Sequence, residues 1–303
     1  MIEQEVTLRV ESVSKHYGDF TAVENLSFNV RAGRVFGFLG PNGAGKTTTI
    51  RMIVGINFPD EGKIELFGSR ISSDLQNRIG YLPEERGLYK KMKIVDQLRY
   101  FAALKNVSQA EADRRIDFWL ERMRLSEWKS KKTTDLSKGM QQKIQFISTV
   151  LHNPDLLILD EPFSGLDPIN VEFLKEVIAE LKAQSKTIIF STHLMETAEQ
   201  LCDDILLINK SRKVVSGSLR EVKASFGRNL IALRAVGGEA VLEDKNLVAK
   251  ITDHADEKHL VLAEHSDAQI LLKSLIENGA LIDKFERIEP SLNDIFIAKI
   301  KGI

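Results

Sequence analysis

The stretch GPNGAGKTT, Gly40 to Thr48, lies between an apolar run and a helical pattern. Its three glycines allow backbone turns that other residues resist, so successive N–H groups can point at phosphate oxygens. Lys46 would reach the outer phosphates of a nucleotide, and the hydroxyl of Thr47 would contact Mg²⁺. The spacing therefore predicts a binding loop for a nucleoside triphosphate and Mg²⁺. The predicted members are Gly40, Pro41, Asn42, Gly43, Ala44, Gly45, Lys46, Thr47 and Thr48.

The residues on either side of this loop support the same interpretation. RVFGFL, residues 34–39, is a short apolar run typical of a buried strand. TTTIRMIVGI, residues 47–56, predicts a helix that leaves the loop. The positive N-terminal end of such a helix would face the phosphates. A glycine-rich turn that arose by chance would lack this strand and helix.

Composition limits the class of protein. The chain has 303 residues, of which 43% are hydrophobic and 28% are charged, and this is typical of a folded globular protein. Its formal net charge of -1 provides no general attraction to nucleic acid. Cys202 is the single cysteine, which excludes an intramolecular disulfide and a four-cysteine zinc site. The N-terminus has no export signal pattern, and no apolar run approaches the roughly 18 residues that cross a bilayer. We therefore expect a chain that is neither exported nor membrane-spanning.

Hydrophobic periodicity predicts a large α/β domain over residues 1–220. Short alternating runs within residues 6–35 predict antiparallel strands joined by tight turns. Apolar residues spaced by three and four predict a helical insert at about residues 84–150. LLILDEP and TIIFSTH predict buried strands, and a helix over residues 171–183 between them indicates a parallel arrangement. The expected sheet is therefore mixed.

The remaining residues, 221–303, predict a separate small α+β domain. Strands are expected over residues 230–236, 247–252, 260–263 and 281–288, with a helix over residues 266–278. Ser291 and Asp294 have the spacing of a capping box at the start of a last helix. No catalytic residue is predicted in this domain.

Two adjacent carboxylates end the predicted strand LLILDEP. Alternation along a strand would turn Asp160 and Glu161 toward different neighbours, so they can have different roles. Asp160 fits a Mg²⁺ position beside Thr47, and Glu161 fits a base that orients and deprotonates an attacking water. We expect Glu161 to be catalytic and Asp160 to bind the metal.

The order of motifs resembles that of the ATP-binding-cassette ATPases. LSKGMQQK, residues 136–143, precedes LLILDEP, and SGLD, residues 164–167, follows it. The resemblance covers residues 8 to about 217 and implies a P-loop fold that hydrolyses ATP with Mg²⁺. It implies that Tyr17 stacks on adenine. It also implies that His193 contacts the γ-phosphate and helps to hold the attacking water, as a second catalytic residue.

The resemblance also implies an active site shared between two chains. In this family the signature segment, here Ser137, Lys138 and Gly139, contacts the nucleotide held by a second copy. Asp167 would lie at the same interface, although capping the helix that begins at Pro168 also explains it. We therefore expect a homodimer, or a pair of related cassettes, in which ATP binding closes the dimer.

Two departures from the family pattern are present. Lys138 and Met140 alter the usual signature LSGGQ; Lys138 could add positive charge near the partner's nucleotide or simply face solvent. Glu84 in YLPEERGLY stands where the family has glutamine, and its carboxylate keeps an oxygen ligand for Mg²⁺. Together these departures resemble the NatA-type branch, whose members drive sodium or drug extrusion. PSLNDIF, residues 290–296, is similar to the accessory domain of drug-export cassettes.

The resulting expectation is the ATPase subunit of an exporter. It would lie in the cytoplasm on the inner face of the cell membrane, beneath separate membrane-spanning permease subunits and without a nucleic-acid partner. The permease would dock over the helical insert and residues 84–92.

One alternative is a soluble cassette ATPase that acts on nucleic acid or ribosomes. Against it count the single cassette, the absence of a heptad tract and the absence of a basic excess. Another is a nucleotide-binding regulator that does not hydrolyse, which Glu161 and His193 disfavour.

Overall fold

The computed structural model describes residues 5–85, 87–226, 229–254 and 256–301. The chain divides into two compact units, Met1–Leu219 and Arg220–Ile303. The first unit contains two sheets and the second contains one, and each unit has its own buried core.

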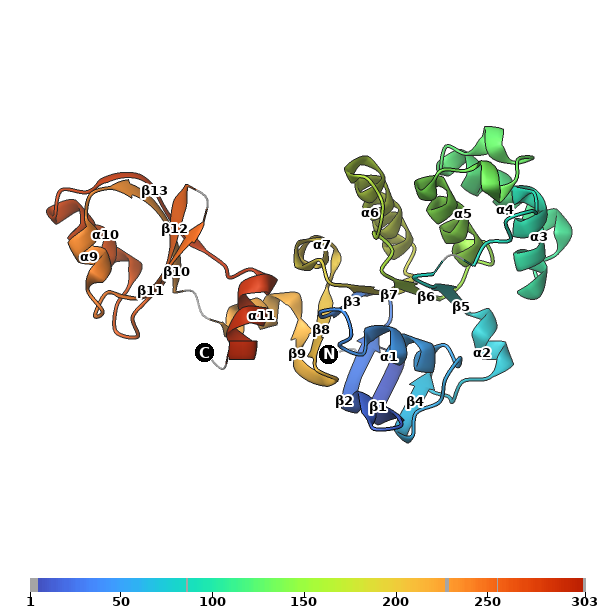
Figure 1. The fold of residues 1–303 in the computed structure, drawn as a ribbon, viewed down its shortest axis with the longest axis horizontal. Coiled ribbons are helices and arrows are strands. Elements are labelled where there is room, and N and C mark those ends of the chain that lie inside the picture. The colour runs from blue at the N-terminus through green and yellow to red at the C-terminus, as the bar shows by residue number, and fades with distance from the viewer. Residues whose placement is uncertain (1–4, 86, 227–228, 255, 302–303) are drawn as a thin grey trace. The chain divides into compact units, whose positions relative to one another are not determined.

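A six-stranded sheet forms the centre of the first unit (Figure 1), in the order β5-β6-β7-β3-β8-β9. The strands β5, β6, β7, β3 and β8 run parallel, and only β9 pairs antiparallel. Four of these strands are nearly continuous apolar runs, because a sheet covered on both faces leaves no side exposed to water. Their bounds are β3 Val35–Leu39, β5 Ile79–Leu82, β6 Leu156–Asp160, β7 Thr187–Thr192, β8 Asp204–Asn209 and β9 Arg212–Ser218.

A second, antiparallel sheet packs near the first. It has the order β2-β1-β4, with β1 Val6–Tyr17, β2 Phe20–Arg31 and β4 Glu61–Leu66. Apolar side chains from this sheet, from α1 (Lys46–Ile53) and from β3, β6 and β8 form one core. The first helix is therefore held in place by the sheets around it. The helix predicted to reach residue 56 ends at Ile53, and Gly55 follows with a φ of 77°.

Helices make up the insert between β5 and β6. They are α3 Ile94–Leu104, α4 Gln109–Arg122 and α5 Lys138–Val150, with short 3-10 turns at Ser126–Trp128 and Thr133–Asp135. Figure 1 shows these helices grouped beside β5 and β6. The remaining helices of this unit are α2 Ser73–Asn77, α6 Pro168–Ala183 and α7 Met195–Leu201. No helix in the described part of the chain is both long and apolar enough to cross a membrane.

The second unit is a four-stranded antiparallel sheet with helices. Its strand order is β11-β12-β10-β13, and α9 and α10 contribute to the core on the sheet. The predicted capping box is present: Ser291 Oγ accepts from Asp294 N at 3.1 Å, and Asp294 Oδ2 accepts from Ser291 N at 3.1 Å. Short α9 was not predicted. The bounds are α8 Leu219–Ser225, β10 Leu230–Val236, α9 Glu239–Glu243, β11 Val248–His254, β12 Glu257–Leu262, α10 Ala268–Glu277, β13 Leu281–Ile288 and α11 Leu292–Lys301.

Candidate functional site

Three neighbouring strands bring the predicted chemistry to one edge of the central sheet. Strands β6, β7 and β3 lie side by side and parallel, so their carboxyl ends share an edge. The loop Gly40–Gly45 follows β3, Glu161 follows β6, and His193 follows β7. Residues that lie more than 100 positions apart in the chain are thereby neighbours.

The loop takes the conformation that its glycines allow. Gly45 precedes α1 with a φ of 106°, and a Cβ atom there would lie 2.4 Å from the carbonyl oxygen of Ala22. Any other residue would clash with this backbone. Lys46, only 6% exposed, donates to the carbonyl oxygens of Gly40 at 2.8 Å and Pro41 at 3.3 Å. Its side chain therefore curls back over the loop.

Glu161 lies at the centre of the site. Its Oε1 atom is 3.5 Å from Lys46 Nζ and 3.1 Å from His193 Nδ1. The residue lies just beyond β6, with a φ of 48°, and its N–H donates to Ser191 Oγ at 3.0 Å. Asp160 and Glu161 do face different neighbours, as predicted, but a left-handed turn produces this rather than strand alternation alone. Positive φ is uncommon outside glycine and is found at functional sites.

Asp160 is fully buried beside Glu161. Ser191 Oγ donates to Asp160 Oδ1, whereas Oδ2 is buried and accepts no hydrogen bond from the described residues. Burial raises the pKa of Asp160, and the hydroxyls of Ser191 and Thr47 lower it in part. An unpaired buried carboxylate oxygen beside Thr47 is what a bound cation would satisfy.

Ser191 was missed at the level of sequence. Only the pairing of Asp160 with Ser191 in the β6–β7 register brings its hydroxyl to both acidic residues. The available signal was a serine within TIIFST, a strand buried along its whole length, because a hydroxyl there needs a partner.

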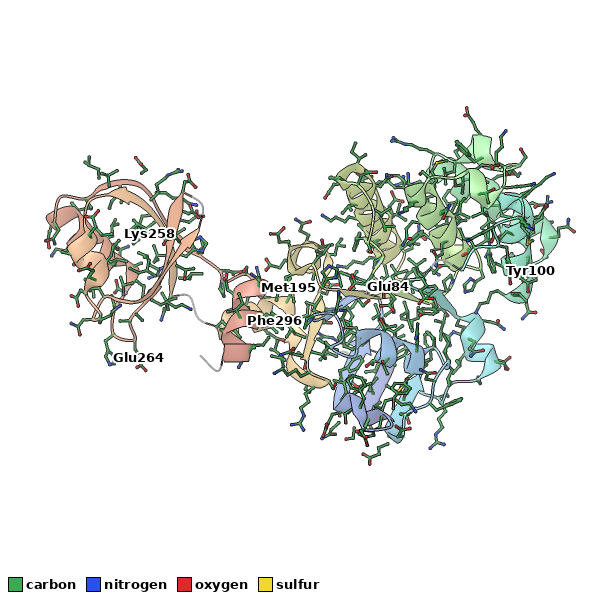
Figure 2. The ribbon with its side chains drawn as sticks, viewed as in Figure 1. Glu84, Tyr100, Met195, Lys258, Glu264 and Phe296 are labelled. Carbon is green, nitrogen blue, oxygen red and sulfur yellow. The ribbon has the colours of Figure 1, made fainter. Side chains whose placement is uncertain are left out.

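A cavity of about 320 Å³ opens over the loop. Residues Asn42–Thr48 line it, together with Phe20, Ala22, Glu84 and Glu161. Glu84 (Figure 2) is exposed and therefore free to approach a bound nucleotide. Tyr17 does not line the cavity: it is 49% exposed, and its hydroxyl accepts from Asn57 Nδ2 at 3.0 Å. Phe20, 60% exposed, is the aromatic side chain on the cavity wall, and sequence reasoning did not single it out.

The signature segment and Asp167 do not line this cavity. They lie at the exposed starts of two helices, α5 and α6. Ser137 caps α5 by accepting from Met140 N at 3.2 Å, and Lys138 is exposed. Asp167 caps α6 by accepting a hydrogen bond from Asn170 N at 3.0 Å, and it also accepts one from Asn170 Nδ2 at 2.6 Å. Both hydrogen bonds lower the pKa of Asp167. None of Ser137, Lys138, Gly139 and Asp167 lines the nucleotide cavity.

The two helix starts are adjacent to one another. A Cβ added at Gly139 would have its nearest neighbours, at 3.8 Å, in the side chains of Asn170 and Leu166, which flank Asp167. The structure therefore brings the signature segment and Asp167 together on one exposed surface, as a group separate from the loop, Glu161 and His193.

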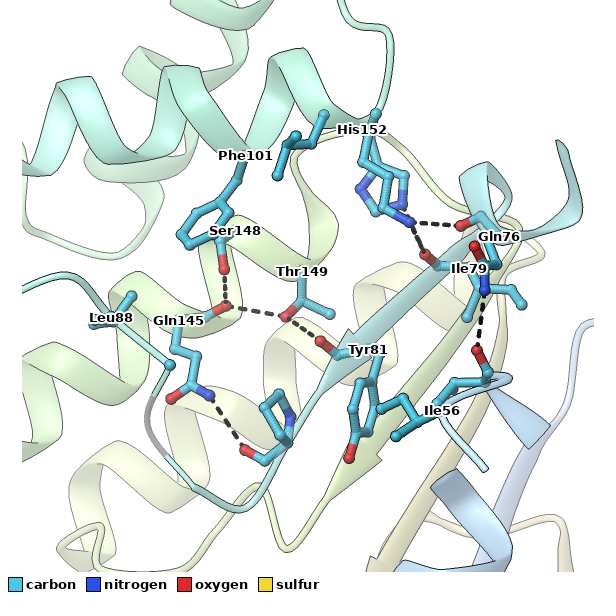
Figure 3. A pocket seen from close by; sticks show the side chains of 15 residues that line it. Ile56, Gln76, Ile79, Tyr81, Leu88, Phe101, Gln145, Ser148, Thr149 and His152 are labelled. Carbon is cyan, nitrogen blue, oxygen red and sulfur yellow. Dashed lines mark hydrogen bonds between the residues drawn. The ribbon is translucent and has the colours of Figure 1, made fainter. Parts of the chain in front are cut away.

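A second cavity, of about 330 Å³, lies between the helical insert and the sheet (Figure 3). Pro83 and Gly87, on either side of the Glu84 segment, both line it. Gln145 is 4% exposed and lines it as well, and its Nε2 donates to the carbonyl oxygens of Pro83 at 3.2 Å and Glu85 at 3.1 Å. One segment thus borders both cavities, and Gln145 holds it.

Family models match both units of the chain. The ABC transporter model matches residues 23–164, and the model of the C-terminal domain of DrrA1-3-like ATP-binding proteins matches residues 217–300. A model described as AAA domain, putative AbiEii toxin, overlaps residues 132–199.

Named relatives and solved structures are similar over most of the chain. The uncharacterized ABC transporter ATP-binding protein YhaQ of Bacillus subtilis strain 168 is 45% identical, over 98% of this chain and 99% of YhaQ. Nod factor export ATP-binding protein I of Ralstonia nicotianae is 36% identical, over 76% of this chain and 75% of its own length. A solved ATP binding subunit of an ABC transporter is 35% identical, with a TM-score of 0.69 over 73% of this chain and 93% of that one. The predicted fold class is thereby confirmed, and the chain belongs to the ATP-binding proteins of ABC transporters.

Proposed function

We propose that this chain is the ATP-hydrolysing subunit of an exporter, and that Glu161 is the general base. The observation that supports this most strongly is the position of Glu161, within 3.5 Å of Lys46 and 3.1 Å of His193 and on the wall of the cavity over the loop. There the carboxylate can orient a water toward the γ-phosphate and accept its proton. His193 would hold the carboxylate in position through Nδ1, and its other ring nitrogen would be left to contact the γ-phosphate and the attacking water. Positioned bases of this kind contribute about 100-fold or more to rate.

Binding of ATP would change the partners of Lys46. Its ammonium now contacts two loop carbonyl oxygens and Glu161, all of which are weaker partners than a triphosphate. Moving Lys46 to the phosphates would release Glu161 for the attacking water. Phe20 provides an aromatic surface on the cavity wall, with Tyr17 as the alternative platform for adenine.

The acidic residues of the site fit Mg²⁺. The buried, unpartnered Oδ2 of Asp160 and the nearby Thr47 hydroxyl are the hard oxygen ligands that this ion prefers. Glu84, on the same cavity wall, would add a third oxygen ligand. Mg²⁺ would neutralise charge on the phosphates, while this chain's residues hold the nucleotide and the water.

Glu84→Gln provides a test of this third ligand. Replacing a carboxylate by an amide weakens binding to a hard cation, so the Mg²⁺ concentration that gives half-maximal ATPase activity should rise several-fold. The measurement is a Mg²⁺ titration of ATPase activity at saturating ATP, with Glu85→Gln as the neighbouring control. If the Mg²⁺ dependence of Glu84→Gln were the same as that of the wild type, Glu84 would not be a Mg²⁺ ligand.

We further propose that two copies together form each complete site. Ser137, Gly139 and Asp167 lie on an exposed surface outside their own chain's cavity, where a second copy could present its nucleotide. The N-terminal end of α5 would there meet a γ-phosphate, and Lys138 would add a positive charge. ATP would hold the copies together until hydrolysis removes the contacts.

Mixing two inactive variants tests this arrangement. Ser137→Arg disables the signature surface and Lys46→Ala disables the loop, so each variant alone should lack activity. A mixed dimer would contain one site with both an intact loop and an intact signature. We expect equimolar mixtures to recover part of the wild-type ATPase activity. Mixtures that stay inactive at all ratios, although the variants still associate, would count against shared sites.

The partner would be a separate membrane permease. Relatives of this chain are named for export and for a transporter complex, and we propose a location on the cytoplasmic face of the membrane. The permease would dock over the helical insert and residues 84–92, where Gln145 holds the segment that also borders the nucleotide cavity. Sodium ions or a drug are the proposed cargo classes.

Copurification from the native membrane tests the partner assignment. We expect a membrane subunit to copurify with the chain. The ATPase activity of the purified complex should rise when sodium or a candidate drug is added. A chain that purifies without any membrane subunit, or together with nucleic acid or ribosomes, would overturn the exporter proposal.

A further inference from the structure

Apolar side chains dominate the lining of the cavity between the helical insert and the sheet (Figure 3), and among the described lining residues one is charged near pH 7. The neutral polar residues of the lining are Gln76, Gln145, Ser148, Thr149 and His152. Below, this cavity is called the insert cleft, and its apolar lining includes Ile56, Tyr81, Phe101 and Leu104. Ile56 and Leu104 remain 57% and 58% exposed. Water-exposed apolar side chains around a cavity are typical of a surface that another molecule covers.

The charged residue in the lining is Lys105, which directly follows α3. Its Nζ atom donates to the carbonyl oxygens of Gln76 at 2.6 Å and Ile79 at 3.5 Å. Within the described residues no carboxylate forms an ion pair with it, and none lines the cleft. Partial burial lowers the pKa of Lys105 with no acidic group opposing the effect. The cleft therefore carries an ammonium group without a counter-ion.

The titratable groups near Lys105 do not balance its charge. His152 Nε2 bonds the carbonyl oxygen of Ile79 at 3.0 Å, and burial lowers the pKa of His152 to about 4, with Lys105, Arg115 and Lys186 adding to the effect. His152 is therefore neutral near pH 7 and cannot balance Lys105. Arg115 differs from Lys105 because it pairs with Glu111 at 2.6 Å.

We propose that Lys105 forms an ion pair with a carboxylate on an otherwise apolar segment of the membrane subunit, and that this pair helps to select that subunit. The inference rests on the exporter function proposed above. A docked apolar segment would remove Lys105 from the remaining water, and burying an unpaired ammonium is costly. A carboxylate opposite Lys105 removes this cost, whereas a segment with lysine or arginine there is rejected.

The test uses the membrane subunit that copurifies with the wild-type chain. Lys105→Met keeps the length of the side chain and removes its charge, and should weaken the affinity for that subunit about 30-fold or more. Lys105→Arg should keep most of the affinity. The matched control is Lys186→Met, because Lys186 also donates to a backbone carbonyl, that of Asn153 at 3.3 Å, but lines a different cavity. It should bind like the wild type.

Two further measurements separate pairing from a structural role. Lys105→Met loses the hydrogen bonds to the carbonyl oxygens of Gln76 and Ile79, so it should melt somewhat lower than the wild type, but it should stay folded and keep its basal ATPase activity. Carbodiimide cross-linking should join Lys105 to one carboxylate of the membrane subunit, which mass spectrometry identifies. Exchanging that carboxylate for lysine should restore binding to Lys105→Glu.

The outcomes distinguish this inference from the function on which it rests. Ile56→Arg places a bulky charge in the cleft and should weaken docking whether or not Lys105 has a partner. If Ile56→Arg weakens binding but Lys105→Met does not, and no cross-link forms, the ion pair is overturned while docking in the cleft stands. If neither variant changes binding, the cleft is not the docking site. If no membrane subunit copurifies, the exporter function itself fails.

Discussion

Glu161→Gln is expected to slow ATP hydrolysis about 100-fold or more and to trap an ATP-bound dimer. The amide has nearly the same shape as the carboxylate but cannot accept the proton of the attacking water. Glu161 Oε1 lies 3.1 Å from His193 and 3.5 Å from Lys46, so the exchange also removes a negative charge from the centre of the site. Nucleotide affinity should not fall, because less negative charge then faces the phosphates.

Three measurements check this expectation. Single-turnover hydrolysis reports the chemical step, gel filtration with ATP and Mg²⁺ reports the dimer, and nucleotide titration reports affinity. Glu172→Gln is a suitable control, because Glu172 is exposed on α6 and pairs only with Lys175 in the described residues. Near-normal turnover of Glu161→Gln would remove Glu161 from the role of base.

Lys46→Ala is expected to abolish ATP binding at ordinary concentrations. A hydrogen bond to a charged group contributes about 1.5–3 kcal/mol. Lys46 would make at least two such bonds to phosphate oxygens, so Kd should rise about 100-fold or more. The variant should also leave Glu161, 7% exposed, without its nearby cation.

Binding is measured by nucleotide titration, and thermal unfolding shows whether the variant is folded. Lys63→Ala serves as the control, since Lys63 is an exposed residue of β4 that pairs with Glu11 at 3.0 Å. A folded Lys46→Ala chain with unchanged affinity for ATP would contradict the role of the loop.

Much of this site could be predicted because its motifs are local. Glycine spacing, a lysine and a threonine are contiguous in residues 40–48, and the flanking apolar run and helix pattern are adjacent to them. The capping box of Ser291 and Asp294 likewise depends on residues three positions apart, and the structure contains it. A short motif of this kind fixes its local backbone conformation without contacts from distant parts of the chain.

Other features could not be predicted because they depend on contacts between distant segments. Ser191 meets Asp160 only through the register of β6 and β7. The left-handed turn at Glu161 has no sequence signature, since positive φ there is imposed by its surroundings. Phe20 and Tyr17 are near each other in sequence, yet only Phe20 lines the cavity. Short α9 escaped prediction because five residues show no helical period.

The sequence by itself determined that this protein binds and hydrolyses a nucleoside triphosphate. The reason is that contiguous residues form each of the motifs involved: the phosphate-binding loop, the acidic end of a buried strand and the helix caps. Only the tertiary structure decided how those parts meet. The strand order β6-β7-β3 gathers the loop, Glu161 and His193 at one edge, and the packing of the insert against β5 leaves Lys105 in a mainly apolar cleft whose described lining includes no carboxylate. The strand order and the packing of the helical insert on the sheet depend on the burial of apolar surface between distant segments, which no single stretch of residues specifies.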